Sequence, residues 1–188
     1  MAAEPQEAQR LVRENTEQML QILHDEAADG QVDLERIRSA LDELILPHLD
    51  FVTMTKLAVG RDWLKADREQ KRALVNEFRS LLVSTYTRSL REYDDQELEF
   101  LPLQAGAEDT RVTVRSRVSQ DDGGDVPVEY SLRHVDGRWV VYDIAVDGIS
   151  MITTHRSSFS DIVSREGIDG LIAHLEEKNA KNADASAS

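Results

Sequence analysis

The chain has 188 residues, of which 40% are hydrophobic and 31% are charged, and 22 basic against 36 acidic side chains give it a formal net charge of −14. Its length suits a single domain with one hydrophobic core, and its negative charge argues against a general binder of nucleic acid or of anionic membranes. No apolar run approaches the roughly 18 residues of a membrane span, and the absence of cysteine rules out disulfides and thiolate metal sites.

The first part of the chain is predicted to form three helices, each bounded by residues that start or stop helices. Apolar residues at three- and four-residue steps predict a helix over residues 6–28. Asp33 is placed to cap a second helix, which we expect Pro47 to stop because proline disfavours a helical residue before it. Asp50 is placed to cap a short third helix, which Gly60 would close in the left-handed conformation.

The best amphipathic pattern of the chain follows, from Asp67 to about Glu92. Asp67 and Gln70 have the three-residue spacing of a capping box, in which each side chain bonds to the backbone of the other residue. The apolar residues of this helix recur on one face: Leu74, Phe78, Leu81, Leu82 and Tyr86.

After this helix the apolar period changes from 3.6 to 2, which predicts four strands. The strands lie near residues 98–100, 112–118, 126–132 and 138–146. Turn signals at Asp121-Asp122-Gly123-Gly124 and Asp136-Gly137 join the last three strands into an antiparallel meander. The fourth strand is apolar at both alternations, so its pattern does not indicate which side chains point inward.

Helices resume after the strands, over about Ser150–Ser164 and Ile168–Lys178, with Ser150 placed as a helix cap. Residues 179–188 are small and polar, which is typical of a disordered tail. We therefore predict a single domain over residues 1–178. Its fold class is α+β, a curved four-stranded antiparallel sheet packed against several helices. The cone that such a sheet encloses would be an apolar cavity wherever side chains do not fill it.

Several short segments together carry a family resemblance. In chain order they are Phe51-Val52-Thr53-Met54, Val59-Gly60, Trp63, Phe78 to Leu82, Thr85-Tyr86, Tyr130-Ser131-Leu132, Trp139-Val140-Val141-Tyr142-Asp143-Ile144, Gly148-Ile149-Ser150 and Arg156-Ser157-Ser158-Phe159. Their order and spacing, over Leu41 to Lys178, resemble the MlaC family, also called the toluene-tolerance auxiliary family. The sequence departs from the family pattern at Ile149, where valine is usual, and at His155, where tyrosine is usual.

The resemblance implies an NTF2-like cone whose cavity holds the acyl chains of a glycerophospholipid. The family carries phospholipid between an outer-membrane MlaA-porin complex and an inner-membrane transporter containing MlaD, in the pathway that maintains outer-membrane lipid asymmetry and solvent tolerance. Its members are exported, so we expect a periplasmic protein whose signal peptide has been removed. The resemblance further implies a monomeric carrier without catalysis and without cofactors other than its lipid cargo.

We expect the lipid-binding side chains to come from the amphipathic helix, the sheet and the exit of the last strand. They are Leu82, Tyr86, Val112, Val114, Val128, Tyr130, Val141, Ile144, Val146, Ile149, Met151 and Ile152. By pattern alone, each is equally an ordinary core residue. A charged replacement such as Val128→Glu separates the two roles, because it is expected to expel lipid.

Arginines supply the other candidate contacts. Arg111, Arg115 and Arg117 alternate with the valines of the second strand and so share the opposite face, where they form either solvated surface or a docking site for an acidic partner. Arg156 is placed to contact a lipid phosphate or to pair with Asp143 at the strand-to-helix junction, and we favour the pairing.

The sequence also suggests two functional classes other than a carrier. Ser150, Asp143 and His155 name the members of a hydrolytic triad, but the chain has no Gly-x-Ser-x-Gly elbow, so we expect no enzyme. The histidines show no paired helical spacing, so we expect no metal site. The alternative to a carrier is an interaction module or chaperone that uses an apolar groove for peptides.

Overall fold

The computed structural model describes residues 3–28, 30, 33–90, 96–119 and 124–186. The fold is α+β, as predicted, and the chain divides into two compact units. The sheet unit comprises residues 1–50 and 90–151, and the helical unit comprises residues 51–89 and 152–188. No described helix combines the length and apolar character needed to cross a membrane.

The sheet unit contains one antiparallel sheet of five strands in the order β1-β2-β3-β4-β5. Its strands are β1 Leu98–Phe100, β2 Arg111–Ser119, β3 Asp125–Val135, β4 Arg138–Val146 and β5 Ile149–Ser150. The prediction of four strands was wrong because the chain reverses after β4. Asp147 and Gly148 have φ of 51° and 77°, which suits a two-residue hairpin turn. Ser150, expected to cap a helix, therefore lies in a strand.

The turn between β3 and β4 is the predicted one. Asp136 and Gly137 have φ of 48° and 80°, the left-handed values that aspartate and glycine tolerate best. The other predicted turn, at residues 121–124, lies largely outside the described residues, because only Gly124 is described.

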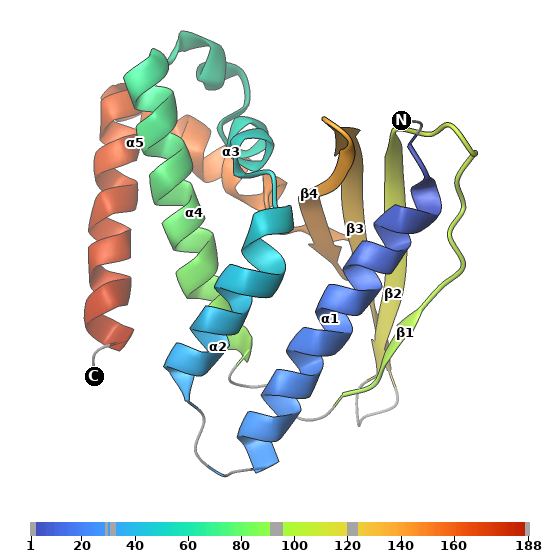
Figure 1. Cartoon of the computed structure of the whole chain (residues 1–188). Helices are drawn as coiled ribbons and strands as arrows, with labels where there is room; N and C mark the ends of the chain where they lie inside the picture. The colour runs from blue at the N-terminus through green and yellow to red at the C-terminus, as the bar shows by residue number, and fades with distance from the viewer. Residues whose placement is uncertain (1–2, 29, 31–32, 91–95, 120–123, 187–188) are drawn as a thin grey trace. The chain divides into compact units, whose positions relative to one another are not determined.

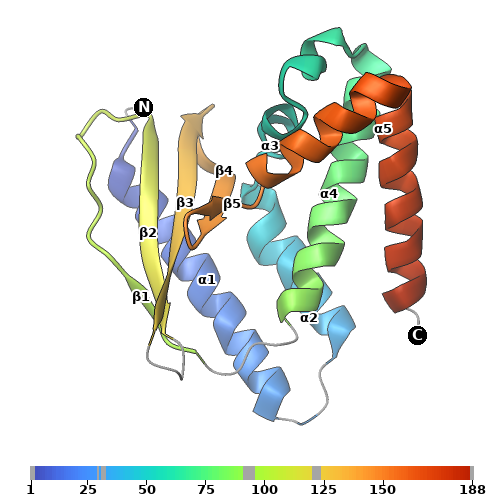
Figure 2. The ribbon, with the colours of Figure 1, turned by 180° about the vertical axis from the view of Figure 1, so that it is seen from behind.

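Helix α1, Pro5–Ala28, lies across one face of the sheet, and the view from behind shows the opposite face (Figures 1 and 2). Polar contacts fix it at its N-terminal end. The Trp139 indole Nε1 donates to the Glu4 carbonyl at 3.1 Å, and Gln9 Nε2 donates to the Leu101 carbonyl at 2.7 Å. Further along the helix, the Arg13 guanidinium lies 5.2 Å from the centroid of the Phe100 ring, within range of a cation–π contact.

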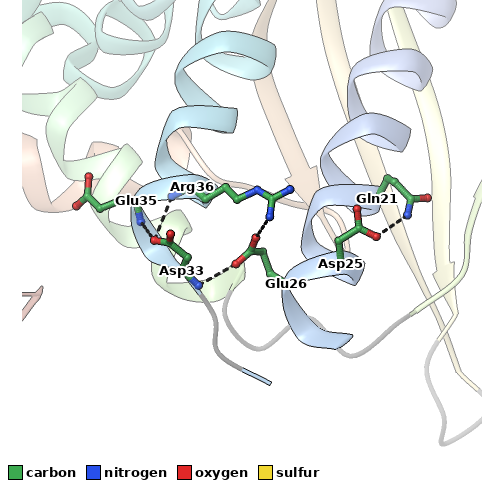
Figure 3. A network of polar contacts seen from close by, with 6 residues as sticks. All are labelled: Gln21, Asp25, Glu26, Asp33, Glu35 and Arg36. Atoms are coloured by element: carbon green, nitrogen blue, oxygen red, sulfur yellow. Dashed lines mark hydrogen bonds and ion pairs between the residues drawn. The ribbon is translucent and has the colours of Figure 1, made fainter. Parts of the chain in front are cut away.

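The second helical segment begins at the predicted cap, since the Asp33 side chain accepts from the backbone N–H groups of the first turn. It comprises α2 Leu34–Ala40, a π-helical stretch Leu41–Ile45 and a 3₁₀ turn Leu46–His48 that contains Pro47. Figure 3 shows how it is tied to α1: the buried Glu26 carboxylate accepts from the Asp33 N–H at 2.9 Å and pairs with Arg36 Nη1 at 2.7 Å.

The helical unit contains α3 Phe51–Val59, a 3₁₀ helix Gly60–Lys65, α4 Arg68–Leu90, a 3₁₀ turn Thr153–His155 and α5 Arg156–Ser186. The last residue of α4 belongs to the sheet unit. The predicted capping box is confirmed: Asp67 N–H donates to Gln70 Oε1 at 3.0 Å, and Gln70 N–H donates to Asp67 Oδ1 at 2.8 Å. Gly60 has φ of 69°, as expected for the residue that closes α3.

Helix α5 contains a break at Gly167, where φ is 73°, so two helical stretches follow one another as predicted. The second stretch runs beyond Lys178 to Ser186, through most of the segment expected to be a disordered tail. There it lies beside α4 (Figure 2). Asn179 Nδ2 donates to both the carbonyl and the carboxylate of Glu77 at 2.8 Å, which holds the start of this segment on α4.

Candidate functional site

Three adjoining cross-strand rows of side chains lie on the sheet face that α1 covers, because residues paired across antiparallel strands share a face. We call this face the α1-facing surface. One row is Phe100, Ser116, Val128, Val146 and Ile149; the next is Val114, Tyr130 and Ile144; the third is Val112, Leu132 and Val141. None of these residues is charged. The surface can therefore accept an apolar ligand without removing a charged side chain from water.

A β-bulge in β4 determines which of its side chains belong to this surface. Ser131 pairs with Asp143, whereas the next residue, Leu132, pairs with Val141, which leaves Tyr142 as the extra residue. Strict alternation would place Val141 and Ile144 on opposite faces, but one inserted residue brings both to the same face. The sequence of this strand is apolar at both alternations and so does not indicate which side chains point inward. The bulge determines which of them face α1.

The structure brings together most of the predicted lipid-binding residues of the sheet. Those that share the α1-facing surface are Val112, Val114, Val128, Tyr130, Val141, Ile144, Val146 and Ile149. Met151, at the end of the sheet unit, donates its N–H to the Ile144 carbonyl at 2.8 Å. Their role in binding lipid stays a prediction, as does the enclosed cavity of an NTF2-like cone.

The remaining predicted residues belong to the helical unit. Leu82 and Ile152 are buried, and Tyr86 is half-buried. Burial raises the pKa of Tyr86, so its hydroxyl stays neutral around pH 7. These residues do not share the α1-facing surface as defined by strand pairing.

Sequence reasoning missed several members of this surface. Leu132 continues the alternation of Val128 and Tyr130 and is fully buried, so the existing pattern could have found it. Phe100 and Ser116 could not be placed without the register, which pairs them directly. Thr16 of α1 was missed because nothing in the helix pattern marks a polar residue that faces a sheet.

A polar cluster, made of Thr16, Ser116 and Tyr130, lies within this apolar surface. The Tyr130 side chain is hydrogen-bonded to Thr16 and Ser116, and the Ser116 hydroxyl donates to the Val128 carbonyl at 3.2 Å. Burial raises the pKa of Tyr130, and the two hydrogen bonds offset part of that rise. The phenol is therefore neutral, and its bonds reduce the cost of burying polar atoms here.

The opposite face of the sheet, which we call the outer face, carries Arg111, Arg115 and Arg117, as predicted. Arg115 Nε contacts Glu129 Oε1 at 2.9 Å on the neighbouring strand. Arg133 Nε donates to Asp50 Oδ2 at 2.8 Å, so Asp50 forms an ion pair with the sheet. Arg115 and Arg133 are thereby neutralised within the chain.

Two hollows lie in the sheet unit. One, of about 270 Å³, opens on the outer face between Gln104, Arg111, Arg115 and the bulge residue Tyr142. The other, of about 440 Å³, opens between α1 and α2 beside Ile22 and Arg36. Both are open to solvent and mixed in polarity, so neither matches the expected apolar cavity.

The three residues that resemble a hydrolytic triad, Ser150, Asp143 and His155, make structural contacts. The Ser150 hydroxyl donates to Asp143 Oδ1 at 2.7 Å across the β4–β5 hairpin. The His155 ring lies 5.3 Å from that of Phe78 and 5.4 Å from that of Phe159 in the helical unit, and burial, followed by the charge of Lys178, lowers its pKa.

Arg156 is bonded to the backbone of α3. Its Nε and Nη2 donate to the Leu57 carbonyl at 2.9 and 2.8 Å, near the C-terminal end of α3. The expected pairing with Asp143 and the alternative contact with a lipid phosphate both stay predictions.

Comparison with known proteins agrees with this architecture. A solved structure, the phospholipid-binding protein from Ralstonia solanacearum in complex with a phospholipid, is 34% identical, with a TM-score of 0.82, and the match covers 96% of this chain and 99% of that one. The toluene tolerance protein ttg2D of Pseudomonas putida is 29% identical over 131 residues, which are 69% of this chain and 60% of that protein.

A second relative is the intermembrane phospholipid transport system binding protein MlaC of Haemophilus influenzae, 21% identical over 77% of this chain and 69% of its own length. The chain thus spans about 60% of the first of these two relatives and more of the second. The family model described as MlaC protein matches residues 13–177. The chain therefore belongs to the MlaC family.

Proposed function

We propose that this protein is a periplasmic carrier that binds glycerophospholipid by its acyl chains and moves it between membranes. The observation that supports this most is the α1-facing surface, whose three rows are uncharged across the sheet. A chain 34% identical to this one has been solved with a phospholipid bound. An uncharged sheet face beneath a helix is where acyl chains would find an apolar environment.

The energetics of lipid in water explain why such a surface is needed. Each buried methylene gains about 0.8 kcal/mol, so two acyl chains with about 30 methylenes would cost roughly 24 kcal/mol to expose. If the binding site of the carrier is about as apolar as the membrane interior, transfer of lipid from membrane to carrier is nearly neutral in free energy. Direction must then come from the complexes that load and unload the carrier.

Family membership suggests what those complexes are. We propose an outer-membrane MlaA-porin complex as one partner and an inner-membrane transporter containing MlaD as the other, with outer-membrane lipid asymmetry as the result. The carrier itself would perform no catalysis and would hold no cofactor beside its cargo. In support, Ser150 is bonded to Asp143 in the β4–β5 hairpin, and the His155 ring packs against Phe78, so both side chains already have structural contacts.

Native mass spectrometry of the protein purified without detergent tests the proposal. The expected result is about one phospholipid or more for each protein, identified after denaturing extraction. A folded protein that carries no lipid and takes none from vesicles would refute the carrier. That second result would favour a module that binds peptides in an apolar groove, the alternative that the sequence leaves open.

A further inference from the structure

The first row of the α1-facing surface crosses all five strands of the sheet, and its exposure rises from β2 to β5. From β2 to β5, the exposed fraction is 1% for Ser116, 9% for Val128, 37% for Val146 and 65% for Ile149. The two outermost residues are β-branched and apolar. The buried interior of the surface therefore continues, without a charged side chain in the row, to solvent at β5.

The hairpin that carries the exposed end is held in place by its backbone. Val146 and Ile149 are paired across the two-residue turn formed by Asp147 and Gly148. The Asp147 N–H donates to the Pro127 carbonyl of β3 at 2.9 Å. Ser150 and Asp143 are bonded to each other beside the turn. These hydrogen bonds hold the hairpin, and with it Val146 and Ile149, in an exposed position.

Single exposed apolar residues are ordinary on protein surfaces and need no explanation. Val146 and Ile149 differ because they adjoin each other and because the row behind them is buried. Along this row, each methylene of an acyl chain that leaves the interior still contacts an apolar side chain. This contact lowers the free energy of the states in which the acyl chain is partly outside the surface.

We propose that Val146 and Ile149 form the port through which an acyl chain of a phospholipid enters and leaves the α1-facing surface. This inference rests on the proposed carrier function and adds a route to it. The port residues act on the rate of lipid exchange, whereas interior residues such as Val128 determine how much lipid is held at equilibrium.

The test measures both quantities on the full chain with vesicles of phosphatidylcholine that contain a self-quenched fluorescent phosphatidylcholine. Ile149→Asn makes the port polar without adding to the net charge of −14, so electrostatic repulsion does not change. The matched control is Leu64→Asn, because Leu64 is 79% exposed but lies in the 3₁₀ helix of the helical unit. Val146→Asn serves as a second port variant.

We expect both port variants to slow the uptake of fluorescent lipid about ten-fold, to lower the equilibrium lipid content by much less than that, and to keep the circular dichroism spectrum of the wild type. Leu64→Asn should match the wild type in both rate and content. Unchanged rates in the port variants would overturn the port, and so would an equal loss of rate and content. A wild-type protein that never takes up phospholipid would instead refute the carrier function itself.

Discussion

The two faces of the sheet are built by alternate residues of the same strands, yet they satisfy opposite physical requirements. On the α1-facing surface, Val114 and Leu132 are fully buried, and the polar group of Tyr130 is hydrogen-bonded to its neighbours. On the outer face, Arg115 and Arg133 stand in ion pairs with Glu129 and Asp50. One face is suited to hold an apolar ligand, and the other is suited to meet water or a polar partner.

The ion pairs of Arg115 and Arg133 show that part of the positive charge on the outer face is neutralised within the chain. A ligand that enters the α1-facing surface gains by removing apolar area from water. A ligand at the outer face would compete with ion pairs that already exist. The two faces should therefore respond differently to the same substitution.

The largest effect is expected when a charge is placed on the α1-facing surface. Val128→Glu should lower the phospholipid content about ten-fold or more, because an ionised carboxylate there would have to be desolvated beside the acyl chains. Lipid extracted per protein molecule gives the measurement. Thr113→Glu adds the same charge to the outer face, beside Arg111 and Arg115, and should leave the content unchanged. Equal content in both variants would remove the distinction between the faces.

A cavity in the α1-facing surface should cost stability. Leu132→Ala removes a fully buried side chain, and such changes cost about 2–5 kcal/mol. Urea denaturation followed by circular dichroism gives the free energy of unfolding. Ser131→Ala, the next residue but on the outer face, should change it by less than about 0.5 kcal/mol. A small effect at Leu132 would mean that the interior is loosely packed.

Removing one hydroxyl from the polar cluster should have an intermediate effect. Tyr130→Phe keeps the ring but takes away the partner of Thr16 and Ser116, which should lower the free energy of unfolding by about 1 kcal/mol. Lipid content should be retained, because the apolar ring stays. If the variant loses its lipid while remaining folded, the hydroxyl contacts the ligand directly.

Breaking an ion pair on the outer face should have little effect. Arg115 and Glu129 are 42% and 40% exposed, and pairs of this kind contribute at most about 1 kcal/mol, often nothing measurable. Arg115→Ala should therefore shift the free energy of unfolding by less than about 0.5 kcal/mol and leave lipid content alone. A loss of lipid from this variant would place part of the binding site on the outer face.

The smallest effect concerns pH. Burial, followed by the Arg138 guanidinium, lowers the pKa of His48 below its usual 6.5. Between the lowered pKa and 6.5 the unfolded chain binds more protons than the folded one, so stability falls as pH drops through that window. His48→Gln should slightly reduce the loss of stability between pH 7 and pH 5. Urea denaturation at the two pH values measures the free energy of unfolding and so gives this loss. The same loss in variant and wild type would exclude His48 as a source.

Comparison of sequence with structure separates local signals from non-local ones. The capping box of Asp67 and Gln70, the cap at Asp33 and the Asp136-Gly137 turn were predictable because each depends on neighbours along the chain. The alternation in β2 and β3 placed their valines on one face for the same reason. The pattern also indicated the α+β class.

The missed features depend on contacts between distant residues. The bulge at Tyr142 is defined by pairing with β3. The fifth strand is the exception, because Ile149 pairs with Val146 across the local Asp147-Gly148 turn. The ion pair between Asp50 and Arg133 joins residues 83 positions apart along the chain. Residues 179–186 are helical although small and polar, and contacts with α4 such as those of Asn179 account for this.

The most direct test of the account is to map where an acyl chain lies. A phospholipid that carries a photoreactive group in its acyl chain is bound, activated, and located by tandem mass spectrometry on individual residues of β2, β3 and β4. The account predicts labels on Val114, Tyr130 and Ile144, which form one row of the α1-facing surface. Labels on Thr113, Arg115 and Tyr142 instead would place the lipid on the outer face and contradict it.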